Sequence, residues 1–371
     1  MSLKYLVISD VHLGHQRTDT NYIIKNLKDY LNDEMLKSID LLFIAGDFFD
    51  RLLSLHNPDV YSIMSFIRVL FERLHTSNTA LRVLKGTNSH DWNQCELFTT
   101  VYNCIKETHP VDYVYVDHLS IEKYKGYDVL YLPDEWRPTS ELIYKDVKAL
   151  LKSKKLSKVD LIIMHGMFSF QVPSALQSPL IHNEFNYLSI CKYYIHPGHI
   201  HQHLEFDRIL AQGSFDRLVH GEEQSKGGYL CEIGEDVTPS YKFIENVNAK
   251  KYITINVNNK TLDDIIARLG KLLTKLPSGS YVRLKSGVDT DAVKYIKKLQ
   301  IRFVDFNLSL KILNSKVKEK EEDISSLYKP ISITKDNILT LLQDIYMKRV
   351  DIEKNNLPKL EKLLNEVIDL V

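Results

Sequence analysis

The sequence predicts an α/β protein whose sheets are flanked by helices. Its apolar runs are short and end abruptly in polar turns, as buried parallel strands do. Stretches with helical periodicity separate the first of these runs. The chain has 371 residues, of which 44% are hydrophobic and 26% charged, so it is long enough for one large domain with one or two small ones.

The expected strands are runs of aliphatic and aromatic residues. The first run, 6–8, leads directly to Asp10, and the second, 41–45, stops at Gly46 and Asp47. Helical periodicity covers 20–37, and 58–75 has the pattern of a helix that is apolar nearly all round. Strands are therefore expected at 6–8, 41–45, 81–84, 129–132, 161–164 and 193–195.

Side chains with metal-binding chemistry follow these strands: Asp10, His12, Asp47, Asn88, His165, His199 and His201. Any one of them alone is more often a turn or capping residue. Together, oxygen and imidazole ligands at strand ends, without thiolates, suit Mn²⁺, Fe²⁺ or Zn²⁺. These seven ligands are too many for one ion, so the sequence predicts a centre of two ions that share a carboxylate.

Composition narrows the class of protein further. Lys+Arg and Asp+Glu both number 48, so the net charge is zero, and nucleic-acid binding would need a local basic patch and metal ions. The four cysteines include no Cys-x-x-Cys pair, which is typical of a reduced, intracellular protein. No secretion signal and no apolar run of membrane-spanning length is visible, so we expect a cytoplasmic protein without membrane contact.

The order of these motifs matches a known family: Asp10-x-His12, Gly46-Asp47-x-x-Asp50, Asn88 with His90-Asp91, a single His165, and Gly198-His199-x-His201. As an ordered set over about residues 1–235, they resemble the calcineurin-like metallophosphoesterases. Two later stretches, Gly-Ser-Phe-Asp-Arg at 213–217 and Lys-Gly-Gly-Tyr-Leu at 226–230, are similar to segments of SbcD-type nuclease subunits of DNA double-strand-break repair complexes.

This resemblance implies a fold, an activity and a cofactor. Residues 1–248 would form a metallophosphoesterase sandwich, and the protein would be a DNA exonuclease or endonuclease that processes ends in repair and recombination. Two divalent ions would be bridged by Asp47, with Mn²⁺ expected and Mg²⁺, Fe²⁺ or Zn²⁺ as alternatives. The other ligands would be Asp10, His12 and His201 on one ion, and Asn88, His165 and His199 on the other. His90, oriented by Asp91, would protonate the leaving 3′ oxygen.

The third motif departs from the family pattern Gly-Asn-His-Asp. This chain has Gly-Thr-Asn-Ser-His-Asp at 86–91, which is two residues longer. If His90 and Asp91 align with the family pair, Ser89 takes the ligand position, whereas a bulged loop would return Asn88 to the metal. We expect Asn88 to be the ligand.

The rest of the chain predicts a second module and a tail. Residues 249–313 show strand patterns at 252–257, 281–285 and 301–304 and helix patterns at 261–273 and 291–299. The resemblance implies that this α+β module caps the active site and steers DNA into it, and a purely structural addition is the alternative. A charged linker at 314–332 leads to two amphipathic helices at 333–371, which by resemblance would bind an SbcC-type coiled-coil ATPase subunit.

Some alternatives remain open at this point. The apolar helix at 58–75 predicts either a homodimer contact or burial between layers. The same metal ligands would also serve a phosphatase acting on small phosphoesters or phosphoproteins. A third hypothesis is a weakly catalytic scaffold subunit that clamps DNA ends, because the third motif is altered.

Overall fold

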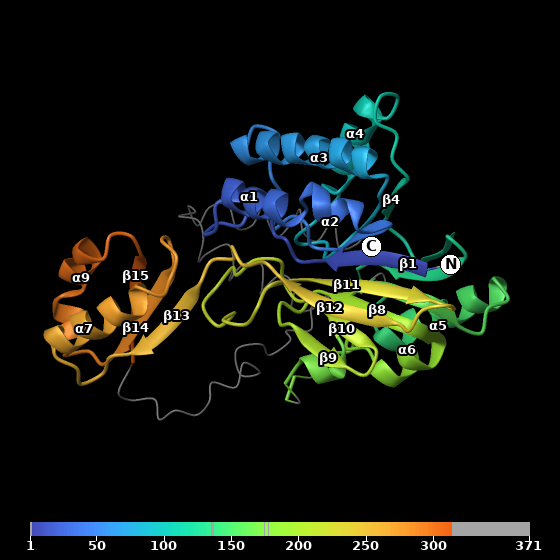
Figure 1. Cartoon of the computed structure of the whole chain (residues 1–371). Helices are drawn as coiled ribbons and strands as arrows, with labels where there is room; N and C mark the ends of the chain where they lie inside the picture. The colour runs from blue at the N-terminus through green and yellow to red at the C-terminus, as the bar shows by residue number, and fades with distance from the viewer. Residues whose placement is uncertain (1, 135–136, 174, 177, 314–371) are drawn as a thin grey trace, which may run out of the picture. The chain divides into compact units, whose positions relative to one another are not determined.

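The computed structural model describes residues 2–134, 137–173, 175–176 and 178–313. Within these residues the chain forms three sheets with helices packed on their faces (Figure 1). The predicted linker at 314–332 and helical tail at 333–371 lie outside the described residues.

The first sheet is built around the amino-terminal strand and has the order β12-β11-β1-β2-β3-β4. Strands β1 to β4 run parallel, with Ile8 opposite Ile44 and Ile44 opposite Val83, so their carboxyl ends lie at one edge. Antiparallel strands extend the other side. The bounds are β1 Ser2–Ile8, β2 Leu41–Ala45, β3 Ala80–Leu84, β4 Tyr113–Val116, β11 Gly227–Gly234 and β12 Ser240–Glu245.

The second sheet has the order β5-β6-β7-β8-β10-β9. Its central strands β6, β7 and β8 are parallel, and His165 at the end of β7 lies opposite Gly198 at the end of β8. The bounds are β5 Ser120–Tyr124, β6 Tyr127–Leu132, β7 Val159–His165, β8 Cys191–Gly198, β9 Leu204–Phe206 and β10 Ile209–Ala211.

These two sheets pack face to face, and helices cover their outer faces (Figure 1). Tyr5 and Phe43 of the first sheet meet Tyr131 and Leu161 of the second in the core between them. The predicted α/β sandwich is therefore confirmed. The first sheet carries α1 Thr20–Tyr30, α2 Asp33–Lys37, α3 Pro58–Ser77 and α4 Glu96–Ile105, and the second carries α5 Ser140–Ser153 and α6 Glu184–Ile190.

The predicted helix at 20–37 is two helices in the structure. Helix α1 ends at Tyr30 with Leu31 as its C-cap, and the Asn32 side chain then caps α2 by accepting a hydrogen bond from the Met35 N–H at 2.9 Å. The apolar periodicity continues from 20 to 37, but the Asn32 cap begins a second helix within it.

The third sheet, β13-β14-β15, is parallel and has its own core with helices on one face. Its elements are β13 Tyr252–Asn256, α7 Leu262–Leu273, β14 Tyr281–Ser286, α8 Asp291–Lys294, α9 Ile296–Arg302 and β15 Asn307–Ile312. The strand predicted at 301–304 is wrong, because Ile301 and Arg302 end α9 and the strand follows later. Ile301 and Val304 are both 79% exposed, and of this apolar run Phe303 alone packs, partly buried, against the core.

Helix α3 covers the outer face of the first sheet, with its apolar side buried against that sheet and its other side exposed. Its polar outer face includes the exposed Arg68, and Tyr61 is its exposed aromatic residue. The homodimer stays a prediction. The residues that made the helix apolar nearly all round lie in the core of the first sheet: Val60, Ile63, Phe66, Ile67, Leu70, Phe71 and Leu74.

Among the described helices, none combines the length and the apolarity that a membrane span requires.

Candidate metal centre

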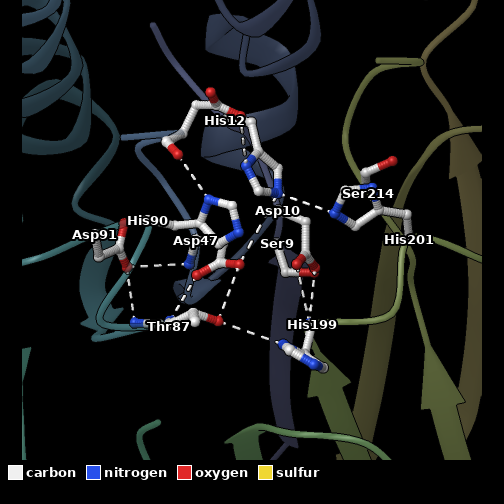
Figure 2. Close-up of polar contacts among 12 residues, drawn as sticks. Ser9, Asp10, His12, Asp47, Thr87, His90, Asp91, His199, His201 and Ser214 are labelled. Carbon is white, nitrogen blue, oxygen red and sulfur yellow. Dashed lines mark hydrogen bonds and ion pairs between the residues drawn. The ribbon is translucent and has the colours of Figure 1, made fainter. Parts of the chain in front are cut away.

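The carboxyl edges of the two packed sheets bring most of the predicted ligands together. Figure 2 shows the side chains of Asp10, His12, Asp47, His199 and His201 pointing toward one another. Three groups have candidate ligand atoms within 4.8 Å of one another: Asp10, His12 and His201; Asp47, His165 and His199; and His12, Asp50 and His90.

Two glycines allow the sheets to approach this closely. A Cβ atom on Gly46 would lie 2.2 Å from the His165 Nδ1 atom, and Gly46 also has a φ of +86°. A Cβ atom on Gly198 would lie 2.2 Å from the Ala45 carbonyl oxygen. Any larger residue at either position would push the loops of the two sheets apart.

The backbone is strained at four of the predicted ligands. Asp10, His12, Asp47 and His199 have φ values of 50°, 54°, 49° and 96°. Such conformations cost about 1–3 kcal/mol each in a non-glycine residue and are typical of functional sites. Hydrogen bonds between the loops hold them, since the Asp10 N–H donates to the Gly46 oxygen at 3.0 Å and the His12 N–H donates to the Asp47 oxygen at 3.1 Å.

The first group joins the loop after β1 to the loop after β8. The Nε2 atoms of His12 and His201 lie 3.0 Å apart. Asp10 accepts the His199 backbone N–H at 2.9 Å, which fixes the start of the His199–His201 loop beside β1. Asp10 and His12 belong to one local motif in the loop after β1, and the fold brings His201 to them from the loop after β8.

The second group contains a closely spaced pair of a carboxylate and an imidazole. Asp47 Oδ1 lies 3.3 Å from His165 Nε2, and both side chains are almost fully buried. Burial favours the neutral form of both side chains and so would raise the pKa of Asp47. The nearby His165 imidazole outweighs this effect and holds the pKa of Asp47 well below its usual range. In return, Asp47 overcomes the burial of His165 and raises the pKa of that imidazole to about 10. A buried carboxylate that draws a proton onto its neighbour indicates a site suited to a cation.

The loop after β3 brings Thr87, rather than Asn88, to the second group. The Thr87 hydroxyl lies 3.2 Å from His165 Nε2 and 3.3 Å from both His199 Nδ1 and Asp47 Oδ2. Asn88 and Ser89 are exposed, and the Asn88 N–H donates to Asp134 at 3.0 Å. Thr87 directly follows Gly86, so the extra residues bulge outward after the site rather than before it.

His90 and Asp91 have separate partners. His90 Nδ1 bonds the Asp50 backbone oxygen at 2.6 Å, and its ring contacts His12 with centroids 4.9 Å apart. Asp91 is fully buried and accepts three backbone N–H groups: Asp47 at 3.0 Å, Phe49 at 2.9 Å and Gly86 at 2.7 Å. Burial and the Asp47 charge raise the pKa of Asp91 to about 6, against the effect of the backbone donors. Asp91 thus ties together the loops after β2 and β3, and the Asp50 carbonyl orients His90.

Glu222 is a residue of the site that the sequence did not single out. Its Oε1 atom lies 2.8 Å from His201 Nδ1, and its Oε2 atom accepts the Leu218 N–H at 2.9 Å. The buried Lys226 ammonium lies 3.3 Å from Oε2 and donates to the His201 carbonyl oxygen at 2.8 Å. Although burial favours its neutral form, His201 and Lys226 lower the pKa of Glu222 to about 2. No local sequence pattern predicts that Glu222 holds His201, because the two residues come together only in the folded chain.

The donor set fits divalent cations. Oxygen atoms hold the Nδ1 atoms of two of the proposed ligands, so their Nε2 atoms face the other ligands: the Ala45 carbonyl oxygen holds His165, and the Glu222 carboxylate holds His201. Such partners are typical of metal-binding histidines. The described residues therefore include groups of carboxylates and imidazoles that could bind metal ions.

Comparisons with known proteins add little to this picture. No protein-family model matches the chain, and no curated protein matches its sequence. Among solved structures, the crystal structure of TT1561 of Thermus thermophilus is similar, with 11% sequence identity, a TM-score of 0.37, and 66% of this chain and 99% of that chain covered. Another crystal structure has 14% identity and the same TM-score and coverage. Similarity at this level assigns neither family nor function, so the functional argument rests on the site itself.

Proposed function

We propose that this protein is a metal-dependent phosphodiesterase that cleaves DNA during end processing in repair and recombination. The observation that carries the proposal is the convergence of two carboxylates and four imidazoles at one edge of the sandwich: Asp10, His12, Asp47, His165, His199 and His201. Their resemblance in order to SbcD-type nuclease subunits supports DNA as the substrate.

Two Mn²⁺ ions are the proposed cofactor. When bound, such ions neutralise charge on a phosphate and make water a stronger nucleophile. Asp47 has one oxygen 3.3 Å from His165 and the other 3.9 Å from His12, so its carboxylate lies between the two groups and can serve both. Asp10, His12 and His201 would hold one ion, and His165, His199 and Asp47 the other.

His90 is the proposed general acid. Its Nδ1 atom is held by the Asp50 carbonyl oxygen, so its Nε2 atom is the one that can carry a proton to the leaving oxygen. The ring contact with His12 places it beside the first group of ligands. Asp91 acts as a positioning residue, because its three backbone bonds hold the loops that carry Asp47 and Thr87.

The partners follow from the resemblance alone. We propose that the tail at 333–371 binds an SbcC-type ATPase subunit and that the module at 249–313 guides DNA. One observation favours a second candidate, the weakly catalytic scaffold: Thr87 offers the second group a neutral hydroxyl, which is a poorer ligand than an amide or carboxylate.

Hydrolysis of model esters tests the proposal. The purified chain is incubated with bis(p-nitrophenyl) phosphate, with p-nitrophenyl phosphate and with single-stranded DNA, in Mn²⁺ or EDTA. We expect Mn²⁺-dependent cleavage of the diester and of DNA. Selective cleavage of the monoester would instead assign a phosphatase, and metal binding without any cleavage would assign the scaffold.

A further inference from the structure

Two fully buried polar residues, Ser9 and Gln212, are in contact beside Asp10, and neither is one of the proposed ligands. Ser9 directly follows β1, and Gln212 directly follows β10. Strand β1 lies in the first sheet and β10 in the second, so the contact crosses the sandwich at the edge that carries the ligands. The two sheets approach closely at this point, since a Cβ atom on Gly198 would lie 3.2 Å from the Ser9 Cβ atom.

The hydrogen bonds of Gln212 and Ser9 have a fixed direction. The Gln212 Nε2 atom lies 3.2 Å from the Pro197 carbonyl oxygen and 2.7 Å from Ser9 Oγ. Because a carbonyl oxygen can only accept, the amide must turn its NH₂ group to this side, and it donates to both oxygens. Ser9 Oγ therefore accepts a hydrogen bond from Gln212, and its single proton is left to donate elsewhere.

The Asp10 carboxylate is the acceptor of that proton. Asp10 Oδ2 lies 2.5 Å from Ser9 Oγ, whereas the other acceptor, the Gly213 carbonyl oxygen, is 3.3 Å away. The His199 N–H donates to the same carboxylate, at 2.9 Å from Oδ1 and 3.2 Å from Oδ2 (Figure 2). A chain of hydrogen bonds thus runs from Gln212 through Ser9 to Asp10, and together with the His199 amide it fixes the plane of the carboxylate.

This pair is costly to bury, so a role in stability alone explains it poorly. A buried amide oxygen needs a donor, and Gln212 Oε1 has no hydrogen-bond partner among the residues that the structure describes. Apolar side chains of similar size could replace both partners at little or no cost. A role at Asp10 explains the arrangement, because metal ligands are typically oriented by hydrogen bonds from residues behind them.

We propose that Ser9 and Gln212 are positioning residues, which hold Asp10 in the orientation that binds the ion shared with His12 and His201. The inference rests on the proposed function and assigns a role to two residues outside the ligand set. Glu222 holds His201 in the same group, so outer residues orient ligands in both of the loops that form this group.

Two measurements on the full chain test the role of this pair. Hydrogen exchange of the His199 amide, followed by mass spectrometry in EDTA, reports how firmly the Asp10 carboxylate is held without metal. Isothermal titration of Mn²⁺ into the metal-stripped chain reports the affinity for the ion.

The variants separate the pair from buried hydroxyls in general. Ser9→Ala removes the donor to Asp10, and Gln212→Met keeps a similar volume but removes the amide that directs the Ser9 proton. The matched control is Ser286→Ala, which removes an equally buried hydroxyl from the third sheet. Thermal unfolding in EDTA shows that each variant is folded at the temperature of the titration.

We expect the His199 amide to exchange about 10-fold faster in Ser9→Ala, because the carboxylate that accepts its hydrogen loses its other donor. Mn²⁺ should bind one class of site about 10-fold more weakly in this variant. Gln212→Met should change both quantities in the same direction but by less, since Ser9 keeps its proton. Ser286→Ala should behave as the wild type in both measurements, even if it unfolds at a lower temperature.

An unchanged Mn²⁺ affinity in Ser9→Ala would overturn the proposal, whether or not the His199 amide exchanges faster, because the pair would then be structural only. Equal effects in Ser9→Ala and Ser286→Ala would also overturn it.

The two proposals can fail separately. If the wild type binds Mn²⁺ but hydrolyses no ester, weaker binding by Ser9→Ala still supports the pair and contradicts the phosphodiesterase. Mn²⁺-dependent hydrolysis, with identical isotherms for the wild type and Ser9→Ala, supports the phosphodiesterase and contradicts the pair. A wild type that binds no Mn²⁺ would overturn both.

Discussion

Replacing Glu222 by glutamine should weaken metal binding without touching a metal ligand. Glu222 holds His201 Nδ1 at 2.8 Å and is itself fixed by the Leu218 N–H and by Lys226. Glutamine is nearly isosteric, but it removes the negative charge that orients the ring and raises its basicity. Removing such an outer carboxylate typically reduces metal affinity by about 10–100-fold, or about 1.4–2.7 kcal/mol.

The same substitution also costs stability, and the two effects must be separated. The pKa of Glu222 lowered to about 2 corresponds to about 3 kcal/mol of favourable interaction in the folded state. Lys226 is 1% exposed and would lose its carboxylate partner. Thermal unfolding in EDTA measures this loss directly, and the titration is then run well below the melting temperature of the variant.

Isothermal titration of Mn²⁺ into the metal-stripped chain measures the affinity. The matched control is Glu223→Gln, which removes the same charge from the adjacent, exposed glutamate. We expect Glu223→Gln to bind as the wild type and Glu222→Gln to bind one class of ion about 10–100-fold more weakly. Identical isotherms for the two variants would refute the role given to Glu222.

Three further predictions concern Thr87 and Asp91 in the loop after β3 and the buried His196. Thr87→Val removes the hydroxyl that lies 3.2 Å from His165 and 3.3 Å from His199, so the same titration should show roughly 10-fold weaker binding at that group, and an unchanged affinity would exclude Thr87 from it. Asp91→Asn leaves at least one of three buried backbone donors without an acceptor and should lower the free energy of unfolding by about 1–3 kcal/mol in urea denaturation; a stability equal to the wild type would contradict the bonding described. Burial lowers the pKa of His196 to about 3 from an ordinary value near 6.5, so the stability from its neutral form is complete above pH 6.5 and is lost as the pH falls toward 3. In EDTA, His196→Gln should therefore reduce the loss of unfolding free energy between pH 6.5 and 4.5 by about 2 kcal/mol, and an unchanged slope would assign the acid sensitivity to other groups.

The central strands were predictable because they are buried on both faces. The runs that end at Ile8, Ala45 and Leu84 lie between the core of the sandwich and the helices, so nearly every residue is apolar. Edge strands lack this signal: β5, at Ser120–Tyr124, has no fully buried residue. The error at 301–304 has the opposite origin, since an apolar run there stays exposed at the end of a helix.

The candidate site was predictable where ligands directly follow strands. Asp10, Asp47 and His165 lie at such ends, and the fold brings them together with His12, His199 and His201. Asn88 could not be separated from its neighbours because the path of the loop after Gly86 decides which side chain faces His165. The role of Glu222 depends on a fold-level contact across the loop that follows His201, which no local pattern encodes.

The most direct test of the account is cleavage of linear and single-stranded DNA as a function of added Mn²⁺, with wild type and His90→Ala compared side by side. The account predicts cleavage by the wild type that rises with Mn²⁺ and disappears in EDTA. It predicts that His90→Ala binds Mn²⁺ as the wild type and leaves the DNA intact. Full cleavage by His90→Ala would contradict its role as the general acid, and cleavage that persists in EDTA would contradict the metal-dependent mechanism.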